Sequence, residues 1–154
     1  MLLTDLSLNM FPINIVRLSG SAPKFVKAST SIPTLFAIYR ARKYLDKNAV
    51  TDISLTITGG LRISSDFAKA LALGADAVAI STTALVAIGC QQYRICHTGR
   101  CPVGITTQDA ELRGRFDIDN SVQRFVNFYR ATAEEVANLA RINGRSNVHD
   151  LDLT

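Results

Sequence analysis

A strand, a helix and a second strand follow one another between residues 53 and 81, and this succession constrains the fold more than any other feature of the chain. Residues 53–58 alternate in polarity, are rich in β-branched side chains and end at Gly59-Gly60, which is typical of a strand that leads into a turn. Residues 76–81 are almost continuously apolar, and this composition predicts a parallel strand buried on both faces.

The segment between these two strands has the spacing of a helix. Its apolar residues recur every three or four positions, at Phe67, Ala68, Leu71 and Ala72. Ser64 or Ser65 can cap the start of this helix, and Gly74 ends it. Together the three segments predict a βαβ unit with parallel strands.

Similar patterns predict further elements on either side of this unit. Helical spacing is found over residues 33–45, 83–88, 108–115 and 121–142, and a β-type run over residues 13–16. The last helix has one apolar stripe, formed by Val122, Phe125, Val126, Tyr129, Ala133, Val136 and Ala140. So few parallel strands make a poor independent domain, because they expose unpaired edges that globular proteins cover or close. The chain is therefore expected to be part of something larger.

Charge and composition argue against two classes of protein. The formal net charge of +4 comes from Lys and Arg residues dispersed along the chain, whereas nucleic-acid-binding surfaces gather them into one stripe. Lys69 and Asp76 interrupt the longest apolar run, so no membrane-spanning helix is predicted. Residues 1–9 contain Asp5 and no basic leader, which argues against a secretory signal and favours a cytoplasmic protein.

Three cysteines lie close together in the sequence. Five residues separate Cys90 from Cys96, four separate Cys96 from Cys101, and Pro102 follows directly. Three thiols cannot all pair in disulfides, and iron prefers thiolate ligands, so the spacing favours an iron–sulfur cluster with three protein ligands. Two alternatives stay open: a zinc ion held by the same cysteines and His97, and cysteines that bind nothing. His97 is adjacent to Cys96 and would be strained to reach the same ion, so we expect it to be a hydrogen-bonding neighbour of the site and not a ligand.

The Gly59-Gly60 pair lies between a strand and a helix that begins near Ser64. Backbone amides in such a turn, together with a helix N-terminus, can bind a phosphate, and Thr82 can add a hydroxyl from the next loop. A plain tight turn explains the two glycines equally well.

Residues 19–153 together resemble the end of the FMN-binding synthase domain of glutamate synthase, especially its archaeal-type large subunit. The resemblance depends on Gly-Ser-Ala-Pro at residues 20–23, on residues 58–62 and 68–76 around the glycine turn, and on the cysteine segment, residues 87–90 and 96–109. The cysteine spacing is that of the three-iron four-sulfur (3Fe-4S) cluster of this family.

The resemblance implies a fold and a reaction. The fold is α/β: residues 19–154 would be the C-terminal portion, about three βα units, of a (β/α)8 TIM-type barrel plus C-terminal helices, with the iron–sulfur loop at residues 90–101. The resemblance does not extend to the N-terminal segment, so residues 1–18 are left unassigned. The reaction is that of an oxidoreductase, in which glutamine amide nitrogen is joined to 2-oxoglutarate and the imine is reduced at FMN to give glutamate.

The resemblance also implies site residues and partners. Cys90, Cys96 and Cys101 would be the cluster ligands, and Gly59, Gly60 and Thr82 would surround the flavin phosphate. The partners would be the N-terminal remainder of the barrel, a glutaminase domain or subunit, and an electron donor, either ferredoxin or an NAD(P)H-linked subunit. The alternative is an iron–sulfur electron-transfer module or an inactive remnant of the same family.

Overall fold

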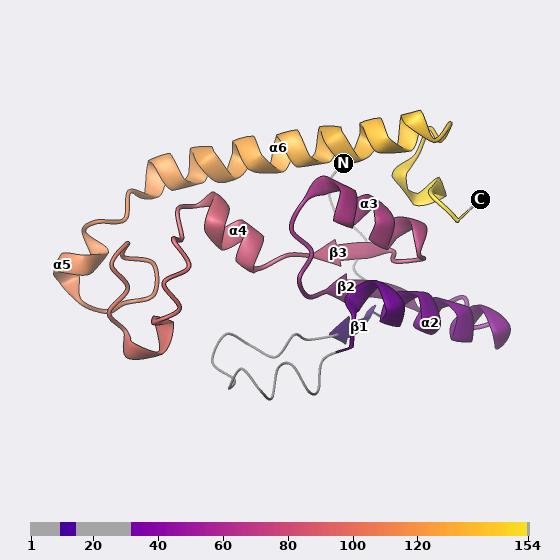
Figure 1. Ribbon diagram of the computed structural model, residues 1–154, viewed down its shortest axis with the longest axis horizontal. Coiled ribbons are helices and arrows are strands. Elements are labelled where there is room, and N and C mark those ends of the chain that lie inside the picture. The colour runs from indigo at the N-terminus through magenta and orange to yellow at the C-terminus, as the bar shows by residue number, and fades with distance from the viewer. Residues whose placement is uncertain (1–9, 15–31, 154) are drawn as a thin grey trace.

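Three parallel strands form one open sheet in the computed structural model, which describes residues 10–14 and 32–153 (Figure 1). The sheet has the order β1-β2-β3, with β1 at Met10–Asn14, β2 at Ser54–Thr58 and β3 at Ala77–Ala79. The helices are α2 (Thr34–Lys47), α3 (Ser64–Ala72), α4 (Thr82–Ala87), α5 (Ala110–Arg113) and α6 (Ile118–Ile142), with short 3₁₀ turns η1 (Cys96–Thr98) and η2 (Val148–Asp150). The predicted βαβ unit is confirmed, because α3 connects the parallel neighbours β2 and β3.

The first strand lies in the segment that the sequence left unassigned. β1 pairs in parallel with β2, with Ile13 opposite Ile57. The strand predicted over residues 13–16 therefore begins three residues earlier, and residues 15 and 16 lie outside the described part of the chain. The Gly-Ser-Ala-Pro block at residues 20–23 also lies outside it.

The centre of the core is on β2. Leu55 and Ile57 are 1% and 0% exposed, and their cluster includes Ile38 of α2, Phe67 of α3 and Val136 of α6. Burial of an aliphatic side chain of this size contributes about 1.5–3 kcal/mol. The alternating polarity of residues 53–58 thus predicted the strand, and the structure shows that Leu55 and Ile57 form its buried face.

β3 differs from the prediction in length and in burial. It is three residues long, and both Ala77 and Ala79 are exposed, so the predicted burial on both faces is wrong. The physical reason is that no described element covers the second face of the strand. Its start is tied to β2 by Asp76, whose N–H donates to the Leu55 carbonyl at 2.9 Å and whose carboxylate accepts the Leu55 N–H at 2.6 Å.

The start of α3 also differs from the prediction. Ile63 occupies the N-cap position and Ser64 is the first helical residue, so neither serine caps the helix. Instead, the Asp66 carboxylate reaches back and accepts the Arg62 N–H at 3.0 Å, just before the helix. A carboxylate in the first turn also interacts favourably with the helix dipole. Gly74 follows the helix with φ +97°, as the sequence predicted for its end.

The long helix α6 packs along both α3 and α4 (Figure 1). Its start is capped by Asp117, whose carboxylate accepts the Asn120 N–H at 3.0 Å. The predicted stripe is partly confirmed: Val136 and Ala140 are buried, but Val122 and Tyr129 are more than half exposed. Among the described helices, none combines the length and hydrophobicity that crossing a membrane requires.

Candidate cysteine loop and glycine turn

The glycine turn directly follows β2. Gly59 and Gly60 have φ angles of +117° and +75°, which only glycine adopts readily. Two hydroxyl groups fix the carbonyls of this turn, because Thr34 donates to the Gly59 oxygen at 2.5 Å and Thr83 donates to the Leu61 oxygen at 3.1 Å. The turn is therefore held from α2 on one side and from α4 on the other.

The structure places Thr82 at the same edge of the sheet as this turn. β2 and β3 are parallel neighbours with Thr58 opposite Ala79, so their carboxyl ends meet. Thr82 follows the end of β3 as the exposed first residue of α4. Ligands of open and closed α/β sheets bind at this end of the strands. Gly59, Gly60 and Thr82 thus lie where an anion could be received.

The cysteine loop, defined here as residues 89–109, connects α4 to α5. Cys90 is half-buried, Cys96 begins η1 and is exposed, and Cys101 is buried with 8% exposure. All three are free thiols. Between the first two, Gln92 and Arg94 have φ angles of +56° and +59°, a conformation that non-glycine residues adopt at an energetic cost. The backbone between these two thiols is therefore strained.

Cys101 has the most structured surroundings of the three. Burial opposes ionisation of its thiol, but the N–H groups of Thr106, Ile105 and Val103 and the Thr106 hydroxyl bond to the sulfur, and the net effect lowers the pKa to about 7. A thiol with a pKa of about 7 is about half ionised at neutral pH, whereas an ordinary cysteine is mostly protonated there, and the thiolate is the form that binds metals.

Gly104 makes this arrangement possible. Its φ is +80°, and a side chain at this position would collide with the carbonyl oxygen of Leu112 and crowd Phe116. Its N–H donates to the Cys101 carbonyl at 3.1 Å, which closes the turn over the cysteine. The loop therefore reaches the start of the C-terminal helices only with glycine here.

The structure does not gather the three sulfurs into one metal site. Within residues 10–14 and 32–153, no three His, Cys, Asp or Glu side chains come close enough together to hold a metal ion. This applies equally to the zinc alternative with His97, which is exposed. The three thiols, and the hydrogen bonds that stabilise the Cys101 thiolate, are of the chemical type that binds an iron–sulfur cluster. The three sulfurs themselves do not come together in this structure.

The sequence analysis missed two residues that shape the site, Thr34 and Thr106. Thr34 has no recognisable signal, because it lies 25 residues before the glycine whose carbonyl it binds and only the fold brings them together. Thr106 could have been suspected from its position soon after Cys101-Pro102, where a hydroxyl can reach the sulfur.

Comparison with known proteins gives one consistent result. A family model described as a conserved region in glutamate synthase matches residues 19–146, which include the glycine turn and the cysteine loop. The archaeal glutamate synthase (NADPH) of Archaeoglobus fulgidus is 42% identical over 119 residues, which are 77% of this chain and 23% of that protein. The corresponding protein of Methanocaldococcus jannaschii is 38% identical over 86% of this chain and 26% of its own length.

The name of another relative specifies a different electron donor. The ferredoxin-dependent glutamate synthase of Pyropia yezoensis is 33% identical over 86% of this chain and 9% of its own length. The chain thus spans about a quarter of the length of the archaeal relatives it matches.

Proposed function

The chain belongs to the glutamate synthase family, and we propose that it supplies the flavin-phosphate and iron–sulfur part of such an enzyme. In the proposed glutamate synthase reaction, the amide nitrogen of glutamine is joined to 2-oxoglutarate, and reduction at FMN gives glutamate. One observation carries the proposal: the family match over residues 19–146 includes both the glycine turn and the cysteine loop. Residues 19–154 would be the end of the synthase barrel; residues 1–18, which the resemblance leaves unassigned, include β1, the strand that pairs with β2.

Cys90, Cys96 and Cys101 would hold the three-iron four-sulfur cluster. Bound there, the cluster would supply one-electron transfer to the flavin. Cys101 contributes a thiol whose pKa of about 7 makes it about half ionised at neutral pH. The other two sulfurs would join it when the cluster binds, because metal sites of this kind are commonly completed together with the folding of their loop. The strained backbone at Gln92 and Arg94 marks the segment that would rearrange.

Gly59, Gly60 and Thr82 would receive the FMN phosphate. Their place at the carboxyl ends of β2 and β3 supports this role, since phosphate sites of (β/α)8 barrels lie after the last two strands. Thr34 and Thr83 would orient the turn by holding its carbonyl groups.

The partners would be the parts of a synthase that this chain does not contain. They are the first βα units of the barrel, a glutaminase domain or subunit that releases ammonia, and an electron donor. The names of the relatives include both NADPH and ferredoxin as donors, and either would serve here.

The proposal is tested by complementation. The chain is coexpressed anaerobically with the part of the Archaeoglobus fulgidus relative that lies outside its matched segment. We expect glutamate to form from glutamine and 2-oxoglutarate with a reduced donor. Replacement of Cys96 by Ser should reduce the rate at least about 100-fold, because loss of a metal ligand interrupts electron delivery.

A complex that contains flavin and cluster but forms no glutamate would instead favour the second candidate, an iron–sulfur electron-transfer module. This candidate is favoured by the length of the match: the chain covers about a quarter of its archaeal relatives, and it includes the cysteine loop but not most of the synthase.

A further inference from the structure

The backbone of Cys90 is tied to the end of helix α4. The N–H of Gly89 donates to the Val86 carbonyl at 3.0 Å, and the N–H of Cys90 donates to the Leu85 carbonyl at 2.9 Å. These two bonds form the Schellman motif of helix C-termini, in which the residue after the C-cap adopts a left-handed conformation. Gly89 does so, with φ +112°. The position of Cys90 therefore depends on where the end of α4 is held.

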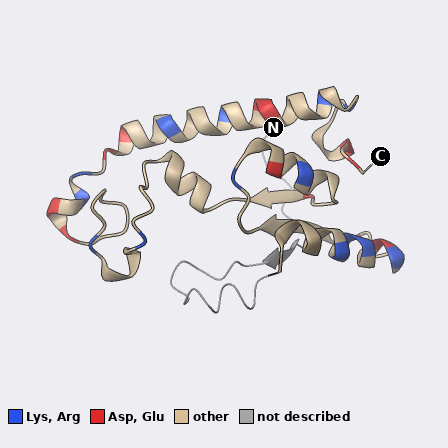
Figure 2. Cartoon of the chain, viewed as in Figure 1, with Lys and Arg blue, Asp and Glu red and all other residues tan. Residues whose placement is uncertain are grey.

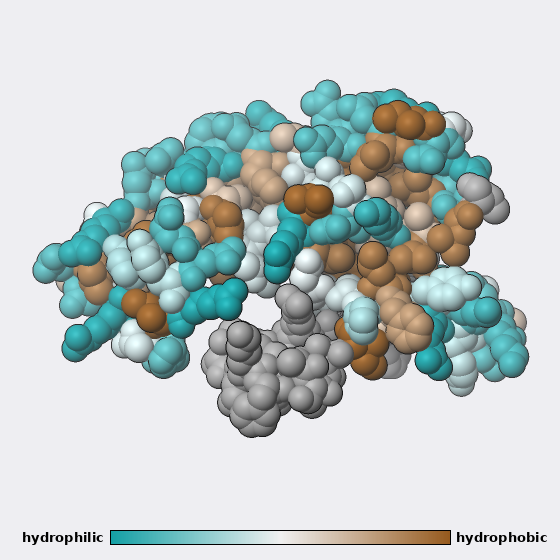
Figure 3. Space-filling view, in the orientation of Figure 1, coloured by the Kyte–Doolittle hydropathy of each residue, from teal (hydrophilic) through white to brown (hydrophobic). Residues whose placement is uncertain are grey.

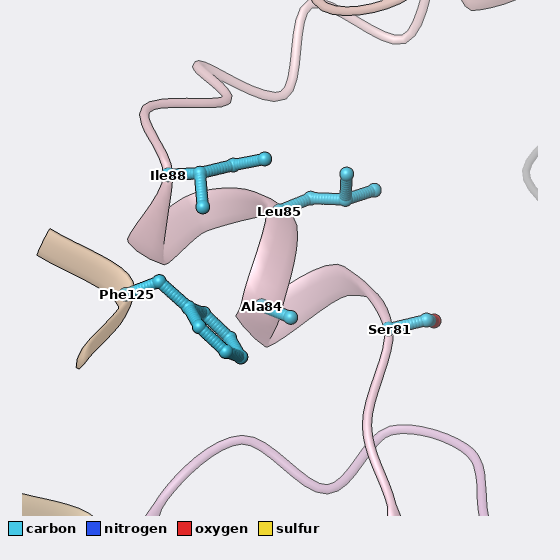
Figure 4. A pocket seen from close by; sticks show the side chains of 5 residues that line it. All are labelled: Ser81, Ala84, Leu85, Ile88 and Phe125. Carbon is cyan, nitrogen blue, oxygen red and sulfur yellow. The ribbon is translucent and has the colours of Figure 1, made fainter. Parts of the chain in front are cut away.

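Neither apolar packing nor charge holds α4 firmly. None of its residues is buried, and it has no acidic or basic side chain, whereas α6 has both (Figure 2). A hollow of about 440 Å³ separates it in part from α6, and it is lined by Ser81, Ala84, Leu85, Ile88 and Phe125 (Figure 4). The outer side of α6 is largely hydrophilic, with hydrophobic surface below it (Figure 3). A polar contact from α6 to the end of α4 would thus be the main constraint on this end.

Ser121 of α6 makes such a contact. It is 8% exposed, and its hydroxyl donates to the Ile88 carbonyl at 3.2 Å, across 33 residues of sequence. Ile88 is the C-cap residue of α4, and carbonyls at a helix C-terminus have no partner within the helix. Ser121 lies four residues before Phe125, so the two side chains are neighbours on one face of α6. A buried hydroxyl from α6 therefore binds the carbonyl two residues before Cys90.

The other end of the cysteine loop is held by the helices that follow it. The buried Thr107 hydroxyl accepts the Asp109 N–H at 3.1 Å, and Asp109 is the N-cap of α5. Between the two ends, residues 91–94 and 96–100 are exposed. Ser121 is thus the counterpart, at the start of the loop, of the contacts that hold its end near Cys101.

We propose that Ser121 is a positioning residue of the cysteine loop, whose hydroxyl fixes the Ile88 carbonyl and thereby holds Cys90 in place to bind the cluster. The part of this inference that concerns the cluster rests on the proposed function, whereas the hold on the loop does not. Ser121 acts through Ile88 and the turn at Gly89, and it is not itself a ligand. Without the hydroxyl, the end of α4 can move away from α6 and take Cys90 with it.

Hydrogen exchange of the metal-free full chain tests the hold on the loop. In the Ser121→Ala variant, the peptide covering residues 86–92 should exchange about fivefold faster than in the wild type, as expected for the loss of one hydrogen bond. The peptide covering residues 101–107 should exchange at the wild-type rate, because it is held by other contacts.

Release of iron tests the consequence for the cluster. The full chain is prepared anaerobically with iron and sulfide, and loss of iron to excess EDTA is followed by the visible absorbance of the cluster. Ser121→Ala should release iron at least about fivefold faster than the wild type. Ser121→Thr keeps the hydroxyl and should restore both the release rate and the exchange rate of residues 86–92.

Ser146→Ala is the matched control. It makes the same chemical change at an exposed serine beyond α6, and it should leave both rates unchanged. Circular dichroism verifies that each variant folds. If Ser121→Thr does not fold, the comparison of Ser121→Ala with Ser146→Ala decides the question.

Three results would overturn the role of Ser121: an unchanged exchange rate of residues 86–92 in the folded Ser121→Ala variant, an equal increase at residues 101–107, or release of iron by this variant at the wild-type rate. A wild-type chain that binds no iron would count against the proposed function, and the exchange of the metal-free chain would then decide the hold of Ser121 on Cys90.

Discussion

The sulfur of Cys101 accepts several hydrogen bonds from the backbone and from one side chain of the cysteine loop. Cys101 is nearly as buried as the core residues, yet three backbone N–H groups and the Thr106 hydroxyl bond to its sulfur. Hydrogen bonds that favour the ionised form outweigh burial, which favours the neutral thiol. This balance explains why the residues after the cysteine matter as much as the cysteine itself.

The pKa of Cys101 can be measured in cluster-free protein with Cys90 and Cys96 replaced by Ser. Ultraviolet absorbance of the thiolate should titrate with a pKa of about 7, and Thr106→Val should raise it. Because the folded pKa lies below the unfolded value of about 8.5, the thiolate's contribution to stability is fully present above that value and is lost as pH falls through about 7.

The matched control is Thr98→Val. Its hydroxyl donates to the Ile95 carbonyl and accepts the Arg100 N–H, but it is not among the groups that lower the pKa of Cys101, so the titration should not move. An unchanged pKa in the Thr106→Val variant would contradict the assigned cause.

The sequence revealed the cysteines and glycines of the site, but not the side chains from other elements that hold them in place. The spacing of the cysteines and the pair Gly59-Gly60 are visible in the chain. The hydroxyls of Thr34 and Thr83, which hold the turn, come from other elements and have no local signal. The convergence of the three sulfurs stays a prediction, because the structure does not form it.

At the level of elements, β2 organises the molecule. Its two buried side chains belong to one core cluster with residues of α2, α3 and α6, the last of which lies more than 60 residues further along the chain. The alternation of residues 53–58 was sufficient to predict this strand. The exposure of β3 could not be predicted, because its almost continuously apolar composition is typical of a buried parallel strand.

A pair of identical substitutions tests the role of β2. Ile57→Ala removes a side chain that is 0% exposed and should lower the free energy of unfolding by about 2–5 kcal/mol. Ile142→Ala, at a position that is 80% exposed, should change it by less than about 0.5 kcal/mol. Urea unfolding followed by circular dichroism gives both values, and equal losses would show that β2 is not the centre of the core.

At the scale of the whole molecule, two features of the described part of the chain are incomplete. Among the described residues, Ala77 and Ala79 leave one face of β3 exposed, β1 and β3 each have a free outer edge, and the three cysteines share one loop without their sulfurs meeting. Both features agree with the proposed function, since the proposed barrel would have no strand edge and a metal loop closes around its metal. The central claim is that the sulfurs of Cys90, Cys96 and Cys101 share one inorganic centre.

Iron and acid-labile sulfide in the full chain, expressed and purified anaerobically, test this claim most directly. We predict about three iron atoms per chain in the wild type. His97→Ala should keep the iron, and Cys96→Ser should lose most of it. Wild-type protein that contains zinc or no metal, or a Cys96→Ser variant that retains all of its iron, would contradict the claim.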